Sequence, residues 1–248
     1  NKGLPEKIKS ADLIFHLAAH ETYLDTPDEK VALDGLLTNA LATHHLLEFA
    51  KDCQARFIFA STVDIYQGIV SGTDLKHYFG PTENDEKIFS HTEAKRFAES
   101  LVWEYFKKYN LDVRLVRLGN LYGPGMNLNT SALGKFLSEL LAGHNLFVEG
   151  DGLEKNYYCY LADAVSGLTA VAFNDKAKGN IYPVTDPQPA TVLELAYIIK
   201  KYARPVTEVV FKPSSRKYHL PDVRVIDTQK LKELPWLPQT DLKQGVFL

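Results

Sequence analysis

The segment Phe89-Ser-His-Thr-Glu-Ala-Lys-Arg-Phe-Ala-Glu-Ser-Leu101 decides how the rest of the chain is interpreted. Its apolar residues follow helical rather than strand spacing, and neither Gly nor Pro interrupts the run, so we predict a helix here. His91 and Lys95 are four residues apart and therefore share one face of that helix. A titratable ring beside an ammonium group is either a proton-transfer pair or part of a solvated polar face. The neighbouring segments decide between these two interpretations.

Composition excludes several classes of protein. The chain has 248 residues, of which 45% are hydrophobic and 24% charged, as in a globular protein with a substantial core. A formal net charge of -3 is not the charge of a nucleic-acid-binding surface. No apolar run approaches the roughly 20 residues that a bilayer requires, and no secretory signal pattern is present. We therefore expect neither a nucleic acid nor a membrane as partner.

The cysteines and histidines do not form metal motifs. Cys53 and Cys159 are expected to be reduced structural thiols in a cytoplasmic protein. His16 and His20 have a spacing found in zinc sites, but they straddle the end of a strand and have no Glu between them. We expect no metal. Because the chain begins at Asn1 and its one methionine is Met126, we also expect the natural protein to have an upstream segment.

Strands and helices alternate along the first half of the chain. Buried strands are predicted at residues 12–19, 56–61 and 113–118, with helices at about 28–51 and around Lys95. This order is typical of an α/β, Rossmann-like doubly wound parallel sheet. Ligands of such sheets bind at the carboxyl ends of the strands. The segments that follow the strands are therefore candidates for the site: Ala18–His20, Ser61–Asp64 and Gly119–Tyr122.

The character of the sequence changes after Tyr122. Helices are predicted at about 130–142 and 191–202, a turn at Glu149–Gly152 and a short strand at Asn180–Val184. We predict a core formed by residues 1–123 and 157–185, and a smaller substrate-binding cap formed by 124–156 and 186–248. The aromatic run from Tyr157 to Tyr160 is expected to be strand core and rim, since no basic patch accompanies it.

Several motifs occur in a fixed order along the chain: His16-Leu-Ala-Ala19, Asn39, Phe59-Ala-Ser-Thr-Val-Asp-Ile-Tyr66, Lys95 with Arg96 and Glu99, Arg117-Leu-Gly-Asn-Leu-Tyr-Gly-Pro124, Gly150-Asp-Gly152, Tyr160, Asp163, the tail from Asp222 to Lys230, and Trp236-Leu-Pro238. With these motifs the chain resembles the extended short-chain dehydrogenase/reductase family, specifically its NAD-dependent nucleotide-sugar epimerases, dehydratases and decarboxylases. The resemblance covers nearly the whole chain.

The resemblance implies positions for the cofactor NAD. Ala18 and Ala19 would pass under the cofactor, where small residues let the backbone approach a flat ligand closely. Ser61 would also contact the cofactor, and Lys95 would hold the hydroxyl groups of the nicotinamide ribose.

The resemblance also implies roles toward a nucleotide-sugar substrate. Thr62, four residues before Tyr66, would bond the sugar hydroxyl that is oxidised, and Asp64 falls where the dehydratases and decarboxylases carry an acid. Asn120 matches a residue that contacts the nucleotide-sugar phosphates. Asn39 matches a mainly structural position that ties neighbouring strands together.

Two departures from the family pattern lie in the site. His91 occupies the place of the tyrosine base, four residues before Lys95. An imidazole, with an ordinary pKa near 6.5, can accept a proton at neutral pH without activation, and the charge of Lys95 should lower that pKa. Asn156 stands where many relatives carry an arginine that binds the substrate pyrophosphate, and Lys155 would replace only part of that charge.

A third departure concerns the cofactor. The Gly-rich turn that seats a dinucleotide pyrophosphate on a helix N-terminus is absent from this sequence, together with the strands that normally precede Asp12. A sheet that began at this strand would expose a long apolar edge. We therefore expect the turn to lie upstream in the natural protein.

The function expected from the resemblance is transient oxidation at sugar C4 by NAD, followed by rearrangement and return of the hydride. Thr62 would orient the hydroxyl, His91 would be the base and Lys95 would fix the cofactor. Asp64, the run from Glu99 to Leu101, Met126 and Cys159 look closest to the UDP-glucuronate decarboxylases; epimerase and dehydratase remain alternatives. A catalytically silent member that binds a nucleotide or a protein is the alternative from another class. Relatives usually form homodimers through the helices at about 28–51 and 91–108. Four apolar positions, which we predict to be exposed, would suit this contact: Leu37, Leu41, Phe97 and Trp103.

Overall fold

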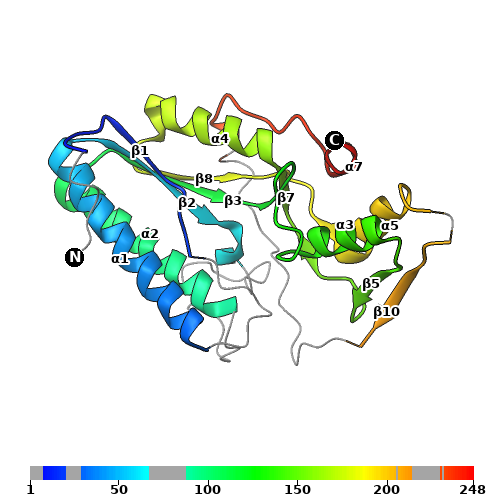
Figure 1. Ribbon diagram of the computed structural model, residues 1–248. Coiled ribbons are helices and arrows are strands. Elements are labelled where there is room, and N and C mark those ends of the chain that lie inside the picture. Colours follow the sequence, from blue (N-terminus) through cyan, green and yellow to red (C-terminus); the bar gives the residue numbers. More distant parts are fainter. Residues whose placement is uncertain (1–7, 21–28, 67–87, 205, 214–229, 231) are drawn as a thin grey trace, which may run out of the picture.

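The computed structural model describes residues 8–20, 29–66, 88–204, 206–213, 230 and 232–248. Its centre is a parallel sheet in the order β1-β2-β3-β8 (Figure 1). These strands are β1 (Leu13–His16), β2 (Arg56–Thr62), β3 (Val113–Leu118) and β8 (Asn180–Val184). The predicted α/β, Rossmann-like parallel sheet is confirmed, and β3 and β8 have the predicted bounds.

Helices cover both faces of this sheet. The long helices α1 (Glu29–Cys53) and α2 (Ile88–Tyr109) lie side by side on one face, and α4 (Leu161–Phe173) lies on the other (Figure 1). The alternation of side chains along each strand produces these two interfaces. On β2, Phe57 and Phe59 enter the core under α1 and α2, whereas Ile58 enters the core under α4. The helix predicted around Lys95 is confirmed as part of α2.

A second group of elements follows the end of β3. Its helices are α3 (Ala132–Ala142) and α5 (Val192–Lys200). They pack with β5 (Leu146–Glu149) in a hydrophobic core that is separate from the two cores of the main sheet. The sequence predicted both helices but not the short pairs of strands. These pairs are β5 with β10 (Val209–Lys212), β4 (Asn120–Tyr122) with β7 (Tyr158–Tyr160), and β6 (Lys155–Asn156) with β9 (Ala190–Thr191).

The C-terminal residues return to α4. The carboxylate of Asp163, 4% exposed, accepts hydrogen bonds from the backbone N–H groups of Gln239 and Thr240 at 3.0 and 2.9 Å. The indole of Trp236 donates to the hydroxyl of Ser166 at 2.8 Å. These bonds seat the segment that precedes α7 (Leu242–Phe247). Two motif residues of the sequence, Asp163 and Trp236, therefore have structural roles. Of the motif at 222–230, all but Lys230 lies outside the described residues.

Candidate active site

The carboxyl ends of three neighbouring strands carry polar side chains on the face covered by α1 and α2. His16 ends β1, Ser61 lies near the end of β2, and Arg117 lies near the end of β3. The residues two positions earlier on these strands belong to the apolar core or pack against it: Ile14, Phe59 and Leu115. The core therefore gives way to a polar layer at the edge of the sheet where a ligand of such a fold would bind.

Lys95 brings a positive charge from α2 into this layer. It is only 7% exposed, and its ammonium group donates to the carbonyl oxygen of Ala60 at 2.8 Å. The ammonium also lies 5.1 Å from the centre of the Phe59 ring. A buried cation is tolerated when it is bonded in this way. These contacts fix the ammonium beside the last residues of β2, where the sequence predicted the cofactor contact.

His91 lies one helical turn before Lys95 and is half-buried. Burial, and secondly the charge of Lys95, lower the pKa of its imidazole from 6.5 to about 4. The expected direction of this change is thus confirmed, but burial, which the sequence did not reveal, is the larger cause. At neutral pH the ring is uncharged and can accept a proton.

Thr62 and Asp64 lie next to each other where β2 turns into the short 3₁₀ helix η1 (Val63–Tyr66). The Thr62 hydroxyl oxygen accepts a hydrogen bond from the backbone N–H of Asp64 at 3.1 Å. Arg96 of α2 donates to the carbonyl oxygen of Ile65 at 3.4 Å. Because Lys95 and Arg96 both bind the backbone of this corner, the structure brings Thr62 and Asp64 together with the first turns of α2.

An ion pair between β3 and α2 lies next to η1. Arg117 forms two hydrogen bonds with the carboxylate of Glu99, at 2.9 and 2.6 Å, and Glu99 is 6% exposed. The guanidinium carbon lies 4.6 Å from the centre of the Tyr66 ring. A paired guanidinium under an aromatic ring fixes the end of η1. The sequence placed Glu99 and Arg117 only in family motifs, and gave no sign that they would meet.

Asn39 connects α1 to the segment after β1. Its side-chain oxygen accepts from the backbone N–H of His20 at 2.7 Å, and its amide nitrogen donates to the His20 carbonyl at 3.0 Å. Asn39 was expected to tie neighbouring strands; instead it ties a helix to a loop, because α1 crosses directly over the end of β1. The loop held in this way contains Ala18 and Ala19, both exposed.

The predicted substrate residues Asn120 and Asn156 are in contact. The amide nitrogen of Asn120 donates to the side-chain oxygen of Asn156 at 3.3 Å. The adjoining Tyr157 packs with Val63 and Tyr66 of η1, so this amide pair adjoins the corner that contains Thr62. Lys155 lies exposed on β6.

Gly119 makes the close passage between β3 and β4 possible. A Cβ atom at this position would lie 2.2 Å from the hydroxyl oxygen of Thr185 and 2.9 Å from the carbonyl oxygen of Tyr157. Any larger residue would collide with Thr185 and with the backbone of Tyr157, which follows Asn156. Gly119 therefore sets the spacing between the two halves of the candidate site.

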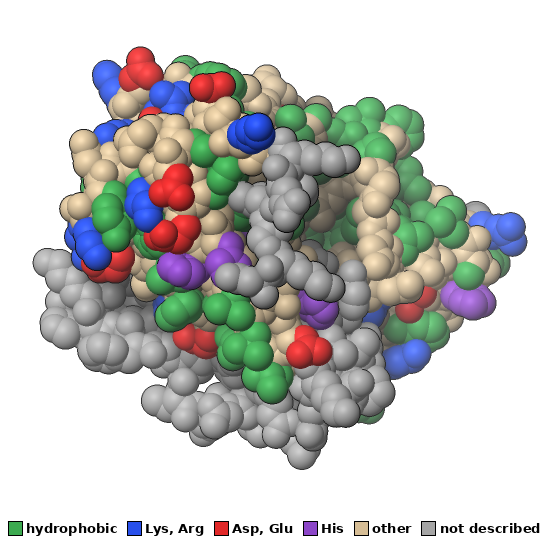
Figure 2. All heavy atoms as spheres, turned by 60° about the vertical axis from the view of Figure 1, so that its left-hand side comes forward, with side chains coloured by type: hydrophobic (Ala, Val, Ile, Leu, Met, Phe, Trp, Pro, Cys, Tyr) green, Lys and Arg blue, Asp and Glu red, His purple; other side chains and the backbone are tan. Residues whose placement is uncertain are grey.

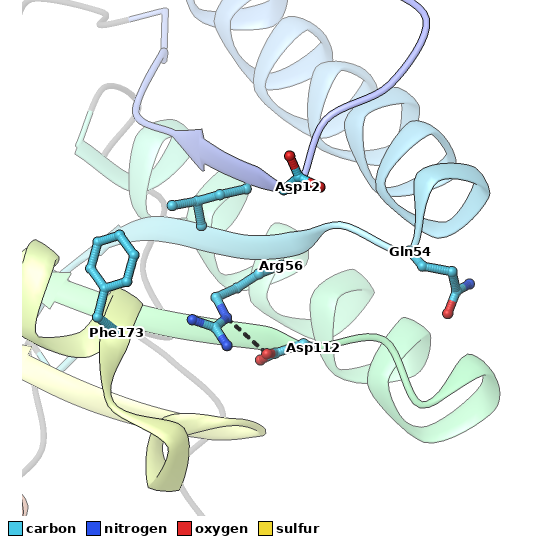
Figure 3. Close-up of a pocket in the computed structure, with 6 residues that line it drawn as sticks. Asp12, Gln54, Arg56, Asp112 and Phe173 are labelled. Atoms are coloured by element: carbon cyan, nitrogen blue, oxygen red, sulfur yellow. Dashed lines mark hydrogen bonds and ion pairs between the residues drawn. The ribbon is translucent and has the colours of Figure 1, made fainter.

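A recess of about 360 Å³ lies away from this site, at the amino ends of β1 and β2 (Figure 3). Arg56 points into it, but its guanidinium already donates to Asp112 at 2.9 Å and to the carbonyl oxygen of Ala172 at 2.7 Å. The guanidinium of Arg56 thus holds β2 to α4. The residues that line it are Asp12, Leu13, Gln54, Arg56, Asp112 and Phe173.

The described part of the chain contains neither a cluster of metal ligands nor a helix that could span a membrane. No group of three or more His, Cys, Asp or Glu side chains gathers there to hold a metal ion. His16, which has a zinc-like spacing to His20, uses its Nε2 atom for a bond with Thr43 at 2.9 Å. None of the helices in the described ranges is long and apolar enough to cross a bilayer.

The chain belongs to the NAD dependent epimerase/dehydratase family, whose model matches residues 4–184. Among curated proteins, it is 30% identical over 237 residues to UDP-glucuronic acid decarboxylase 1 of Arabidopsis thaliana, covering 95% of this chain and 53% of that protein. UDP-glucuronic acid decarboxylase 6 of the same plant is 29% identical over 245 residues, with 96% and 68% covered. The chain thus spans between about half and two thirds of the length of these relatives.

Solved structures agree with this family. The dTDP-glucose 4,6-dehydratase of Streptomyces venezuelae, solved with NAD and TYD bound, superposes with a TM-score of 0.77 at 27% identity, covering 95% of this chain and 70% of that one. UDP-glucuronic acid 4-epimerase of Bacillus cereus, in complex with UDP-glucuronic acid and NAD, has a TM-score of 0.79 at 20% identity, covering 95% and 73%. The latter likeness concerns the fold.

Proposed function

We propose that this protein is an NAD-dependent enzyme that modifies a nucleotide sugar. Decarboxylation of UDP-glucuronate is the first activity to test. The observation that carries the proposal is the corner where Lys95, buried and bonded to Ala60, adjoins both His91 and the β2–η1 turn with Thr62. This corner provides a fixed cation, a neutral proton acceptor and a hydroxyl group at the edge of the sheet where ligands bind. Membership of the epimerase/dehydratase family supports it.

The residues at this corner fit the nicotinamide and ribose end of NAD. The hydroxyl oxygen of Ser61 is buried and has no hydrogen-bond partner among the described residues, as expected of a group reserved for a ligand or water. Ala18 and Ala19 offer backbone with small side chains, and Lys95 offers an ammonium group for ribose hydroxyls. When bound, NAD accepts a hydride from the sugar and later returns it.

The side chains of this chain handle the sugar hydroxyl and its proton. Thr62 would orient the C4 hydroxyl by a hydrogen bond, and a nitrogen of His91 would accept the proton of that hydroxyl. Lys95 holds the cofactor and opposes a lasting positive charge on His91. Asp64 supplies a carboxylate for the rearrangement that follows.

The low pKa of His91 determines how this proton can move. With a pKa of about 4, the imidazole is present almost entirely as the acceptor at neutral pH, but it is a weak base. Full proton transfer before the oxidation would therefore be unfavourable. His91 would therefore accept the proton of the sugar hydroxyl without keeping a lasting positive charge at neutral pH.

The nucleotide end of the substrate would lie against Asn120 and Asn156. Their amide groups can donate to phosphate oxygens but carry no charge, and Lys155 supplies one nearby. Asn156→Arg should therefore lower the KM for a UDP-sugar about tenfold or more, because a bond to a charged group contributes about 1.5–3 kcal/mol. The conservative variant Asn156→Gln is the control, and equal KM values for all three proteins would exclude this residue from phosphate binding.

The test of the proposed function uses the full-length protein with NAD and a panel of UDP-sugars, with products identified by NMR. Release of CO₂ from UDP-glucuronate identifies a decarboxylase, and a C4-inverted sugar identifies an epimerase. If no UDP-sugar is changed while NAD still binds, the alternative of a catalytically silent nucleotide-binding member replaces the enzyme.

We further propose a homodimer formed through α1 and α2. Leu37, Leu41 and Phe97 are 47%, 53% and 53% exposed on these helices, and hydrophobic side chains lie at the surface on this side of the molecule (Figure 2). Trp103, predicted to be exposed, is half-buried because it packs against Phe106, with ring centres 5.6 Å apart. Light scattering should show a dimer for the wild type and a monomer for Leu41→Glu; an unchanged mass would contradict the interface.

The remaining expectations join this proposal. A cytoplasmic location is supported by the two free cysteines, and burial raises the pKa of the Cys159 thiol to about 12, so that it stays protonated.

The division into a core of 1–123 and 157–185 and a cap of 124–156 and 186–248 stays a prediction. Limited proteolysis, which cuts between independently stable units, would test it.

A further inference from the structure

The hydrogen bonds around His16 determine which ring nitrogen carries the proton. The Thr43 hydroxyl donates its single hydrogen to the carbonyl oxygen of Asn39 at 2.8 Å. Its oxygen lies 2.9 Å from Nε2 of His16, and both groups are buried. Because a hydroxyl has only one hydrogen to give, Thr43 must accept from His16. Nε2 therefore carries the proton, and Nδ1 presents a lone pair.

Two buried polar atoms in this layer have no hydrogen-bond partner among the described residues: Nδ1 of His16 and Oγ of Ser61. These residues are 4% and 4% exposed. Such atoms are rarely left unpaired in a folded protein, since an unmet buried polar group costs about 1–3 kcal/mol. One atom accepts a hydrogen bond, and the other can both donate and accept.

The strand register places these two atoms near each other. His16 on β1 pairs with Phe59 on β2, and Ser61 lies two residues further along β2 on the same face. From ordinary strand spacings, the Cα atoms of His16 and Ser61 are about 8 Å apart. The His16 ring packs on Phe59, with centres 5.5 Å apart, and so leans toward this part of β2. Because neither atom has a hydrogen-bond partner among the described residues, the two do not bond directly, and a bridging water fits this spacing.

We propose that His16 and Ser61 together hold one internal water molecule between β1 and β2. The water donates a hydrogen to Nδ1 of His16 and accepts one from Oγ of Ser61. A buried water with two or more polar partners is a normal part of a folded protein. The inference goes beyond the proposed function. Ser61 gives its one hydrogen to this water, and its oxygen can still accept a hydrogen bond from a cofactor.

This water would complete a directed run of hydrogen bonds from the candidate site to α1. The run starts at Ser61, passes through the water to His16, continues to Thr43 and ends at the carbonyl of Asn39. Ser61 directly precedes Thr62, so the run would hold the end of β2 at a fixed distance from α1. His16 is then a positioning residue, because it acts on the site only through the water.

The charge state of His16 agrees with this assignment. Burial, and secondly the charge of Lys95, lower the pKa of the ring from 6.5 to about 4. The ring is therefore neutral at pH 7, with one nitrogen protonated and the other free to accept. Around it lie Thr43 from α1, Phe57 and Phe59 from β2, and the charge of Lys95 from α2.

The experiment combines NMR of the full-length protein carrying ¹⁵N-labelled histidine with a crystal structure at a resolution that shows ordered waters. At pH 7, His16 should show a protonated Nε2 and an unprotonated, hydrogen-bonded Nδ1. The crystal structure should show one water within hydrogen-bond distance of both Nδ1 and the Ser61 hydroxyl.

Substitution of Ser61 tests whether the hydrogen bond to Nδ1 of His16 depends on the Ser61 hydroxyl. Ser61→Ala should move the Nδ1 resonance toward that of an unbonded nitrogen and leave Nε2 unchanged, whereas Ser100→Ala, at an exposed position on α2, should move neither. Three results would each overturn the proposal. They are a proton on Nδ1, a wild-type structure without the bridging water, and an Nδ1 resonance that does not change in Ser61→Ala. The wild-type measurements decide the question even if Ser61→Ala fails to fold.

Discussion

His16 should make the stability of this protein fall as the pH is lowered from neutral. Its pKa is about 4 in the folded protein and near the ordinary value of 6.5 in the unfolded chain. Between these values the unfolded chain binds a proton that the folded chain excludes, so acid favours unfolding. Above pH 6.5 the ring is neutral in both states and has no such effect. The destabilisation therefore develops as the pH falls from about 6.5 to about 4.

The size of this effect follows from the two pKa values. At about 1.4 kcal/mol for each pH unit, the difference corresponds to about 3 kcal/mol of unfolding free energy. His16 is 4% exposed, so solvent screening takes little from this value. It would be a large fraction of the 5–15 kcal/mol that is typical of a folded protein.

The assay is urea unfolding of wild type and His16→Gln from pH 7 to pH 4. Gln keeps a donor where Nε2 lies but cannot titrate, and all other groups titrate in both proteins. The stability advantage of the wild type over His16→Gln should therefore shrink by about 3 kcal/mol across this range. His45→Gln removes an exposed histidine from α1 and serves as the control. A difference between wild type and His16→Gln that stays constant with pH, or grows in acid, would refute the buried neutral ring.

Two further predictions concern the supports of the site. Glu99→Gln leaves the largely buried guanidinium of Arg117, 14% exposed, without its charged partner. It should lower the unfolding free energy by about 3–5 kcal/mol in urea titrations; a loss below about 1 kcal/mol would show that the pair is solvated in solution. Gly119→Ala should destabilise by at least 1–3 kcal/mol and raise KM, because its Cβ would lie 2.2 Å from Thr185. Gly125→Ala is the matched control: its φ is +83°, but no atom lies within 4 Å of the added Cβ, so only backbone strain is expected. Equal losses in the two glycine variants would argue against the contact at Gly119.

The parallel sheet and its main helices were predictable because their signals are local. Continuous apolar strands and a helical run without Gly or Pro are properties of short segments. The bounds of β3 matched the prediction because the chain leaves the sheet at Gly119. By contrast, the pairing of β5 with β10 joins residues more than 60 positions apart, through short strands that lack a strong alternation.

For the candidate site, the sequence proposed the members but did not predict the contacts that the structure shows between supporting residues. The family resemblance assigned Thr62, His91 and Lys95 to one site, and the spacing of four residues put His91 and Lys95 on one helix face. The bonds from Thr43 to His16 and from Glu99 to Arg117 join different helices and strands, and no sequence spacing encodes them. Burial of His91 likewise depends on how α2 packs, which is why the sequence predicted the direction of its pKa change but missed its larger cause.

In the proposed reaction, His91 accepts the proton of the sugar hydroxyl. The most direct measurement is the turnover of UDP-glucuronate with NAD at pH 7 by the full-length wild type and by His91→Ala. Loss of a positioned base should reduce kcat on the order of 100-fold or more, while His91→Tyr, which restores a phenol beside Lys95, should preserve or raise it. Turnover by His91→Ala equal to that of the wild type would remove His91 from the mechanism.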